Sequence, residues 1–268
     1  MNSIHKWLIL STECVDKLIF NDCHQRTKKG ARLMETILSI SILSIRDQPF
    51  MVRLVNLVIQ RQALILDSFM QHIRISAVAL VIIIAIGIPL GILITRTRKI
   101  APYVIAFTGF LYTIPVIAFF GFMLPILGTG RRPAIAALLI YGLLPLVRNT
   151  YVGITEVDEG MLEAARGMGS TNSQILRYVE IPMALPYIIA AIRTVTVMTI
   201  SIATIAAFIG GGGLGVLIFR GITTRTFELT VAGSILVALL AIIADGILGL
   251  IERWVNRKYF GILKNKNI

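Results

Sequence analysis

Charged residues are scarce in this sequence of 268 amino acids, since Asp, Glu, Lys and Arg together make up only 15%. Hydrophobic residues make up 56%, and the mean hydropathy of +0.82 is far above that of a soluble domain. The formal net charge is +12, and the basic residues lie at the ends of apolar runs and in the tails. This placement favours contact with anionic membrane lipid over nucleic acid. The composition therefore predicts a multi-pass protein of the cell membrane with no nucleic-acid partner.

Side chains that carry catalysis or bind metals are also few. The sequence has three histidines and two cysteines, Cys14 and Cys23, which we interpret as ordinary thiols. The apolar runs contain no cluster of His, Cys or paired carboxylates that would indicate a membrane enzyme. The phosphate-binding motif G-x-x-x-x-G-K-[ST] does not occur, so the chain does not bind ATP by that route. We expect no enzymatic activity, no metal site and no cofactor.

Long apolar runs predict about five transmembrane helices, because a bilayer core requires about 20 apolar residues in a helix. The predicted spans are 75–95, 102–127, 133–152, 186–208 and 229–251. Pro115 and Pro125 are expected to bend the second span or to mark its end. These spans form a predicted transmembrane domain over residues 74–252 of an all-α membrane protein.

The segments that flank this domain are of different kinds. Residues 51–73 have helical apolar spacing between charged residues and predict an amphipathic helix in the membrane interface. Residues 1–50 form a poorly defined extension, for which a start at Met51 and a weak extra span over 33–45 both stay open. The basic segments 96–99 and 253–268 are predicted to be cytoplasmic by the positive-inside rule. The polar loop over residues 153–185, here called the coupling loop, then also lies in the cytoplasm.

The coupling loop carries the most specific pattern in the chain. Acidic residues precede a short helix that contains Ala164 and Ala165, and Gly167 and Gly169 are expected to end it. Ser170 or Thr171 is then expected to cap a second short helix, which prolines stop before the fourth span. From this chemistry alone, an ordinary solvated linker helix is the simpler interpretation.

The spacing of the coupling loop resembles the EAA loop of ABC-importer permeases. That pattern is E-A-A, three residues, G, nine residues and I-x-L-P, and here it is matched by Glu163, Ala164, Ala165, Gly169, Val179, Ile181 and Pro182. Val179 stands in place of Ile and Ile181 in place of Leu. The resemblance implies a type I ABC importer (MetI-like) permease fold. It also implies ABC ATP-binding subunits on separate chains, which would contact this loop.

Further segments are similar to osmoprotectant permeases, namely 89–93, 141–151 and 206–215, and the similarity covers about residues 55–255. It implies an importer of glycine betaine, choline or carnitine, served by a separate extracellular or periplasmic substrate-binding protein. A permease for another small solute, such as an amino acid or a bile-acid-type compound, stays open, as does an ATP-independent secondary transporter. We expect a dimer, with itself or with a related permease.

Two further features are candidate sites. The glycines of the segment 210–215 are too dense for a straight helix, and the resemblance favours an outer gate or hinge over a simple turn: Gly210, Gly211, Gly212, Gly213 and Gly215. With Arg148 taken as the end of its span, Arg193 and Asp245 are the charged residues within the predicted spans, and both lie roughly 10 Å from the cytoplasmic ends. We predict that they form an intramembrane ion pair, as a static contact or as a link that rearranges during transport.

Overall fold

A computed structural model describes residues 49–97 and 99–264, with side chains as far as residue 258. These residues form helices and turns. The helices are α2 (Phe50–Gln60), α3 (Gln62–Arg96), α4 (Ala101–Thr113), α5 (Val116–Leu127), α6 (Arg131–Thr155), α7 (Glu159–Gly167), α8 (Asn172–Ile175), α9 (Ile181–Ile205), α10 (Gly215–Thr223) and α11 (Phe227–Lys264). Nearly all of the predicted extension 1–50, including the weak span over 33–45, lies outside the described residues.

The chain divides into two units, residues 1–56 and 57–268, and the second unit contains every long helix. Four stretches in the described part are long and apolar enough to cross a membrane: Gln62–Arg96, Arg131–Thr155, Asn172–Ile209 and Phe227–Lys258. The helices α4 and α5 are long and apolar enough only when taken together, as one span bent by 94° or as a re-entrant loop. This all-helical arrangement confirms the predicted fold class.

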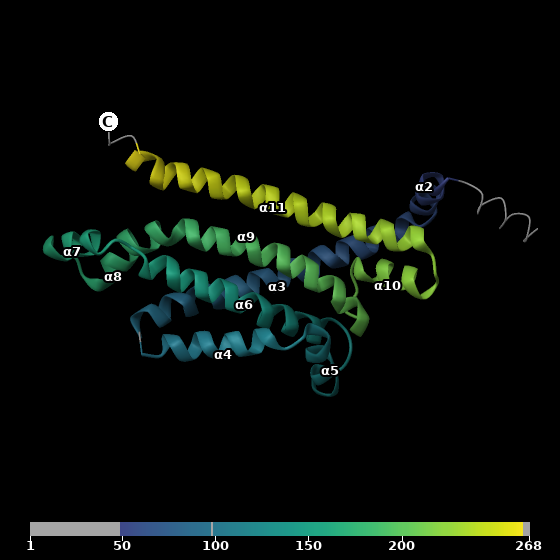
Figure 1. Cartoon of the computed structure of the whole chain (residues 1–268), viewed down its shortest axis with the longest axis horizontal. Coiled ribbons are helices and arrows are strands. Elements are labelled where there is room, and N and C mark those ends of the chain that lie inside the picture. The colour runs from purple at the N-terminus through teal and green to yellow at the C-terminus, as the bar shows by residue number, and fades with distance from the viewer. Residues whose placement is uncertain (1–48, 98, 265–268) are drawn as a thin grey trace, which may run out of the picture. The chain divides into compact units, whose positions relative to one another are not determined.

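Within this unit, α3, α6 and α9 pack against one another, and α11 packs along α9 (Figure 1). The main core lies among α3, α6 and α9, where aliphatic and small residues are buried: Ile75, Ala79, Ile83, Leu138, Leu146, Ala191, Val195 and Ala203. In contrast, only 6% of the most apolar stretch of α11 is buried. The outer face of α11 is therefore a large apolar surface that the chain itself leaves open.

The helix boundary near the first span differs from the sequence expectation. The break lies at Arg61, and α3 continues from Gln62 through residue 73 into the first span. No glycine or proline occurs between Gln62 and Ile86, so nothing interrupts the backbone hydrogen bonds of this helix. The second half of the predicted interfacial helix is thus part of a 35-residue helix.

Pro115 breaks a helix, whereas Pro182 and Pro186 lie inside one. The second span bends at Pro115, where the preceding Ile114 has an extended backbone, with φ −67° and ψ 126°, as is usual before proline. Pro182 and Pro186, however, do not end a helix, because α9 contains both. The turn from Leu176 to Glu180 is a π-helix, which shifts the hydrogen-bond register just before Pro182. A continuous helical stretch from Asn172 to Ile209 results.

Candidate functional site

The coupling loop forms a compact helical hairpin at one end of the helices (Figure 1). Helix α7 begins after Asp158, whose carboxylate accepts a hydrogen bond of 3.0 Å from the backbone N–H of Met161. At its other end, Gly169 has a φ of +80°, and the N–H of Ser170 donates to the carbonyl of Ala165 at 3.1 Å. A left-handed glycine with this bond is a common helix stop, and it reverses the chain sharply.

The second half of the hairpin starts at a capping box. The Thr171 hydroxyl accepts from the N–H of Gln174 at 3.4 Å, and the Gln174 side-chain oxygen accepts from the N–H of Thr171 at 2.8 Å. These bonds begin α8, which continues through the π-helical turn into α9. The hairpin is therefore joined to a membrane-crossing helix without a flexible linker.

The residues of the EAA-like pattern fall into two groups by exposure. Glu163, Ala164 and Gly169 are exposed on the hairpin, whereas Ala165 is buried with 4% of its surface exposed. Val179, Ile181 and Pro182 are half-buried, and they lie in the π-helical turn and the start of α9. The first group thus forms an open surface of small side chains around one carboxylate, and the second group connects that surface to the span.

Sequence reasoning missed Glu180, which lies inside the second half of this pattern. Its side chain is only 8% exposed. It accepts two hydrogen bonds from the guanidinium of Arg96, one of them from Nη1 to Oε1 at 3.2 Å. The pair joins the end of α3 to the turn that follows the hairpin. A carboxylate next to the start of an apolar span was the available signal, because such a charge requires a partner.

At the opposite end of the helices, the glycine-rich segment (210–215) follows α9 and its 3₁₀ extension, Ala206–Ile209 (Figure 1). Gly210, Gly212 and Gly213 have positive φ values of 78° to 82°. A Cβ on Gly213 would lie 2.8 Å from the His72 imidazole, and one on Gly212 would lie 2.4 Å from the Gln71 side chain. The left-handed backbone favours glycine at both positions, and the close approach of His72 excludes a larger residue at Gly213 as well.

His72 and Gln71 on α3 hold this segment. The backbone N–H of Leu214 donates to Nδ1 of His72 at 3.3 Å, and that of Gly213 donates to Oε1 of Gln71 at 3.4 Å. Gln71 in turn donates to Asp67 at 2.7 Å. The sequence did not indicate these residues, because they lie 142 positions from their partners.

Arg193 and Asp245 lie side by side between α9 and α11. The Arg193 guanidinium donates to both carboxylate oxygens of Asp245, from Nε at 2.5 Å and from Nη2 at 2.7 Å. Its Nη1 also donates to Glu252 at 3.0 Å, a third member that sequence reasoning missed. Glu252 lies two turns beyond Asp245 on the same helix, so helical spacing was the available signal. The side chains of Arg193 and Asp245 are 37% and 40% exposed, so the cluster faces outward from α9 and α11.

The hairpin, the glycine-rich segment and the Arg193 cluster consist of hydrogen bonds, ion pairs and helix contacts. Among the residues that the structure describes, no three His, Cys, Asp or Glu side chains gather in a way that could hold a metal ion. The described part instead offers an exposed hairpin at one end, a hydrogen-bonded glycine-rich segment at the other, and long helices between them. This arrangement suits a subunit that transmits movement across a membrane.

Comparison with known proteins agrees with this class. The chain resembles the solved inward-facing methionine ABC transporter MetNI with a TM-score of 0.68 and 24% identity, over 73% of this chain and 98% of that chain. At this identity the likeness shows the fold alone, which is that of an ABC-transporter permease. Residues 86–257 match the family described as binding-protein-dependent transport system inner membrane component.

Two relatives have much higher identity. The glycine betaine/carnitine/choline transport system permease protein OpuCB of Bacillus subtilis is 45% identical over 188 residues, or 70% of this chain and 87% of that protein. The osmoprotectant import permease protein OsmW of Salmonella typhimurium is 45% identical over 183 residues, or 66% of this chain and 85% of that protein. The chain belongs to the family of binding-protein-dependent inner-membrane transport components.

This membership confirms the resemblance drawn from the coupling-loop pattern. The chain is a multi-pass inner-membrane permease subunit of an ABC transporter and not an enzyme in its own right. Membership also implies two partners, an ATP-binding subunit and a substrate-binding protein.

Proposed function

We propose that this chain is the permease subunit of an ATP-driven importer for osmoprotectants such as glycine betaine, choline or carnitine. The observation that carries the proposal is the 45% identity to two permeases named for these solutes, over 85% or more of each relative. The likeness to the methionine transporter is not evidence for an amino-acid substrate, because at 24% identity it shows only a shared fold.

The exposed hairpin supports a role for the coupling loop as the contact site for the ATP-binding subunit. Ala164 and Gly169 are small and exposed, so a partner groove can approach the backbone closely. The Arg96–Glu180 pair and the continuous helix into α9 make the hairpin and two membrane helices move together. Closure of the ATP-binding subunits would then tilt these helices and change access to the solute pathway.

The apolar outer face of α11 supports assembly with a second permease chain, either identical or related. Large side chains on this face are exposed: Ile235, Leu239, Ile242, Ile243, Ile247 and Leu250. Lipid can cover such a face, but Arg193 and Asp245 lie on the same side and are costly in lipid. A second permease chain would cover these charges and complete a solute pathway between the two subunits.

Transport by the reconstituted complex tests the function. The permease, its ATP-binding subunit and its binding protein would be placed in proteoliposomes, and uptake of radiolabelled glycine betaine and choline would be measured with ATP inside. We expect ATP-dependent uptake that competing osmoprotectants reduce and methionine does not. Uptake without ATP, or competition by an amino acid alone, would contradict the proposal.

A further inference from the structure

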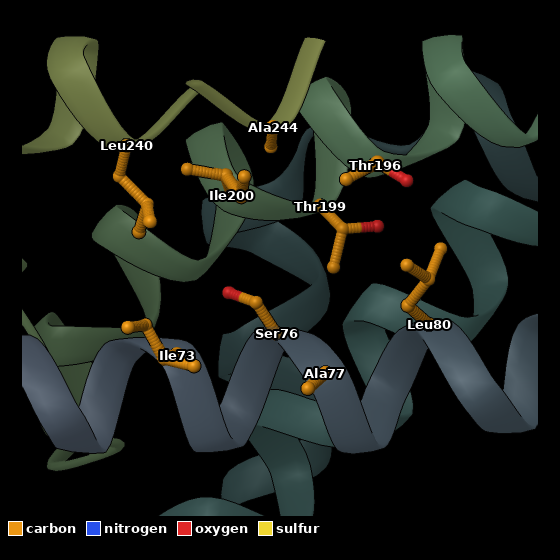
Figure 2. A pocket seen from close by; sticks show the side chains of 9 residues that line it. All are labelled: Ile73, Ser76, Ala77, Leu80, Thr196, Thr199, Ile200, Leu240 and Ala244. Carbon is orange, nitrogen blue, oxygen red and sulfur yellow. The ribbon is translucent and has the colours of Figure 1, made fainter. Parts of the chain in front are cut away.

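A cavity of about 190 Å³ lies between α3, α9 and α11 (Figure 2), and none of its lining residues belongs to the coupling loop or to the glycine-rich segment. Most of its lining is aliphatic, and three hydroxyl side chains interrupt it: Ile73, Ser76, Ala77, Leu80, Thr196, Thr199, Ile200, Leu240 and Ala244. An apolar pocket with a few polar groups is the usual form of a small-molecule site. Its volume suits a compact solute, since the pockets that hold drug-sized ligands have volumes of roughly 300 Å³ or more.

Two of the hydroxyls are buried without a hydrogen bond. Ser76 is 8% exposed and Thr199 is 2% exposed, and neither hydroxyl has a partner among the residues that the structure describes. Burial of an unpaired hydroxyl is unfavourable, so most such groups in proteins bond to another group or to a bound molecule. Figure 2 shows both side chains at the cavity, Ser76 on α3 and Thr199 on α9.

The other hydroxyls of α9 behave differently from Thr199. This helix is described in full, and each of its other Ser and Thr side chains donates to the carbonyl one turn earlier, at 2.7 to 3.3 Å: Thr194, Thr196, Ser201 and Thr204. That local bond is the ordinary way for a helix to satisfy a hydroxyl. Thr199 lacks this bond, so its hydroxyl, on a residue in the wall of the cavity, is left without a partner among the described residues.

We propose that this cavity is a solute site inside the permease. Ser76 and Thr199 would hydrogen-bond the oxygen-bearing end of the solute, and the aliphatic side chains would contact its methylated end. The inference rests on the proposed function and adds to it the place where an osmoprotectant pauses during transport. Two neutral hydroxyls give weak binding, as a translocation site needs so that the solute can leave again.

The charges next to the cavity fit the same class of solute. Thr196 lies one turn from Arg193, and Ala244 precedes Asp245, so the charged cluster begins where the cavity ends on the coupling-loop side. Arg193 and Asp245 also line an open hollow of about 520 Å³ together with the exposed Arg253. A solute that leaves the cavity in this direction meets carboxylates for a quaternary ammonium and guanidinium groups for a carboxylate.

The first test uses the full complex in proteoliposomes with saturating, solute-loaded binding protein. Thr199→Val and Ser76→Ala remove the free hydroxyls with little change of volume. Thr194→Val is the matched control on α9, because Thr194 does not line the cavity and its hydroxyl is already bonded to Ala190. We expect the solute moved per ATP hydrolysed to fall by roughly threefold to tenfold in the first two variants, as expected for one hydrogen bond. Thr194→Val is expected to stay near wild type. Equal ratios in all three variants and wild type, or an equal loss in Thr194→Val, would overturn the proposal.

The second test measures occupancy directly and does not depend on transport. In a background with Cys14→Ser and Cys23→Ser, Thr199→Cys would be labelled in the purified complex by a small thiol reagent. Glycine betaine and choline are expected to slow labelling, whereas a Ser201→Cys variant, whose position is exposed, should show no protection. Labelling unaffected by either solute, as would occur if a lipid chain filled the cavity, would refute the site. If wild-type complex transports osmoprotectants in that case, the proposed function stands and only this inference fails.

Discussion

The His72 imidazole on α3 bonds to the backbone of Leu214 in the glycine-rich segment and also to α9. Its Nδ1 accepts from the N–H of Leu214 at 3.3 Å, and its Nε2 lies 3.1 Å from the carbonyl oxygen of Ile200. Because Nδ1 accepts, Nε2 carries the proton and donates to that carbonyl, which defines one neutral tautomer. The side chain is 1% exposed. One buried residue thus fixes the glycine-rich segment to two membrane helices.

Replacement of His72 should therefore loosen the end of the molecule opposite the coupling loop. His72→Phe fills the space but leaves the N–H of Leu214 buried without its acceptor, which costs about 1–3 kcal/mol. His72→Asn can place an amide oxygen where Nδ1 lies, so it should recover part of the loss in thermal stability and in uptake. Thermal unfolding of the purified complex checks this order, with the exposed Val78→Ala on the same helix as a control. Equal thermal stability and uptake of His72→Phe and His72→Asn would contradict a hydrogen-bonding role for His72.

A charge exchange tests the contact between Arg193 and Asp245. Arg193→Asp places three carboxylates together, and Asp245→Arg places two guanidinium groups together beside Glu252. We expect each single variant to lose most of its uptake, and the double variant Arg193→Asp/Asp245→Arg to regain part of it. Uptake and membrane expression of all four proteins form a double-mutant cycle. A double variant no better than either single variant would show that the pair does not matter as a pair.

The contact between Arg96 and Glu180 predicts unequal effects of its two partners. Arg96→Ala leaves the Glu180 carboxylate buried and unpaired, which costs about 1–3 kcal/mol of stability. The cost is below that of breaking a fully buried ion pair because the Arg96 side of this pair is partly exposed to solvent. Glu180→Gln keeps a hydrogen-bonding side chain and leaves only an exposed cation, so it should be milder. Thermal unfolding and the ratio of uptake to ATP hydrolysis measure both, with the exposed Arg177→Ala as a control. A larger effect of Glu180→Gln would reverse the argument.

Two glycines of the coupling loop that lie close together at the end of α7, Gly167 and Gly169, offer a matched comparison. Both have open space where the Cβ of a larger residue would lie, but only Gly169 has a positive φ, of +80°. Gly169→Val should strain the turn by about 1–2 kcal/mol and reduce uptake more than ATP hydrolysis, because the hairpin would be displaced. Gly167→Ala, at the end of α7, should be neutral or slightly stabilising. Normal uptake by Gly169→Val, or by a bulky Glu163→Trp, would contradict the coupling role.

The sequence determined the parts of this protein that depend on local chemistry. Long apolar runs require helices that satisfy their own backbone in lipid, so the spans and the all-helical fold could be predicted. The EAA-like spacing from Glu163 to Pro182 indicated the class of transporter, since glycine and capping residues act within a few positions of each other.

Only the tertiary structure decided which distant side chains meet. The Arg193 and Asp245 charges could be matched from their depth in the membrane, but Glu180 and Arg96 required the actual packing of α3 against the base of the hairpin. The same holds for His72 with Leu214, and for Ser76 and Thr199, whose free hydroxyls are visible only once three helices enclose the cavity. The continuation of the helix through Pro182 was also visible only in the tertiary structure, where a π-helical turn over Leu176–Glu180 precedes this proline. Contacts across more than 80 positions depend on how helices cross, which apolar periodicity does not specify.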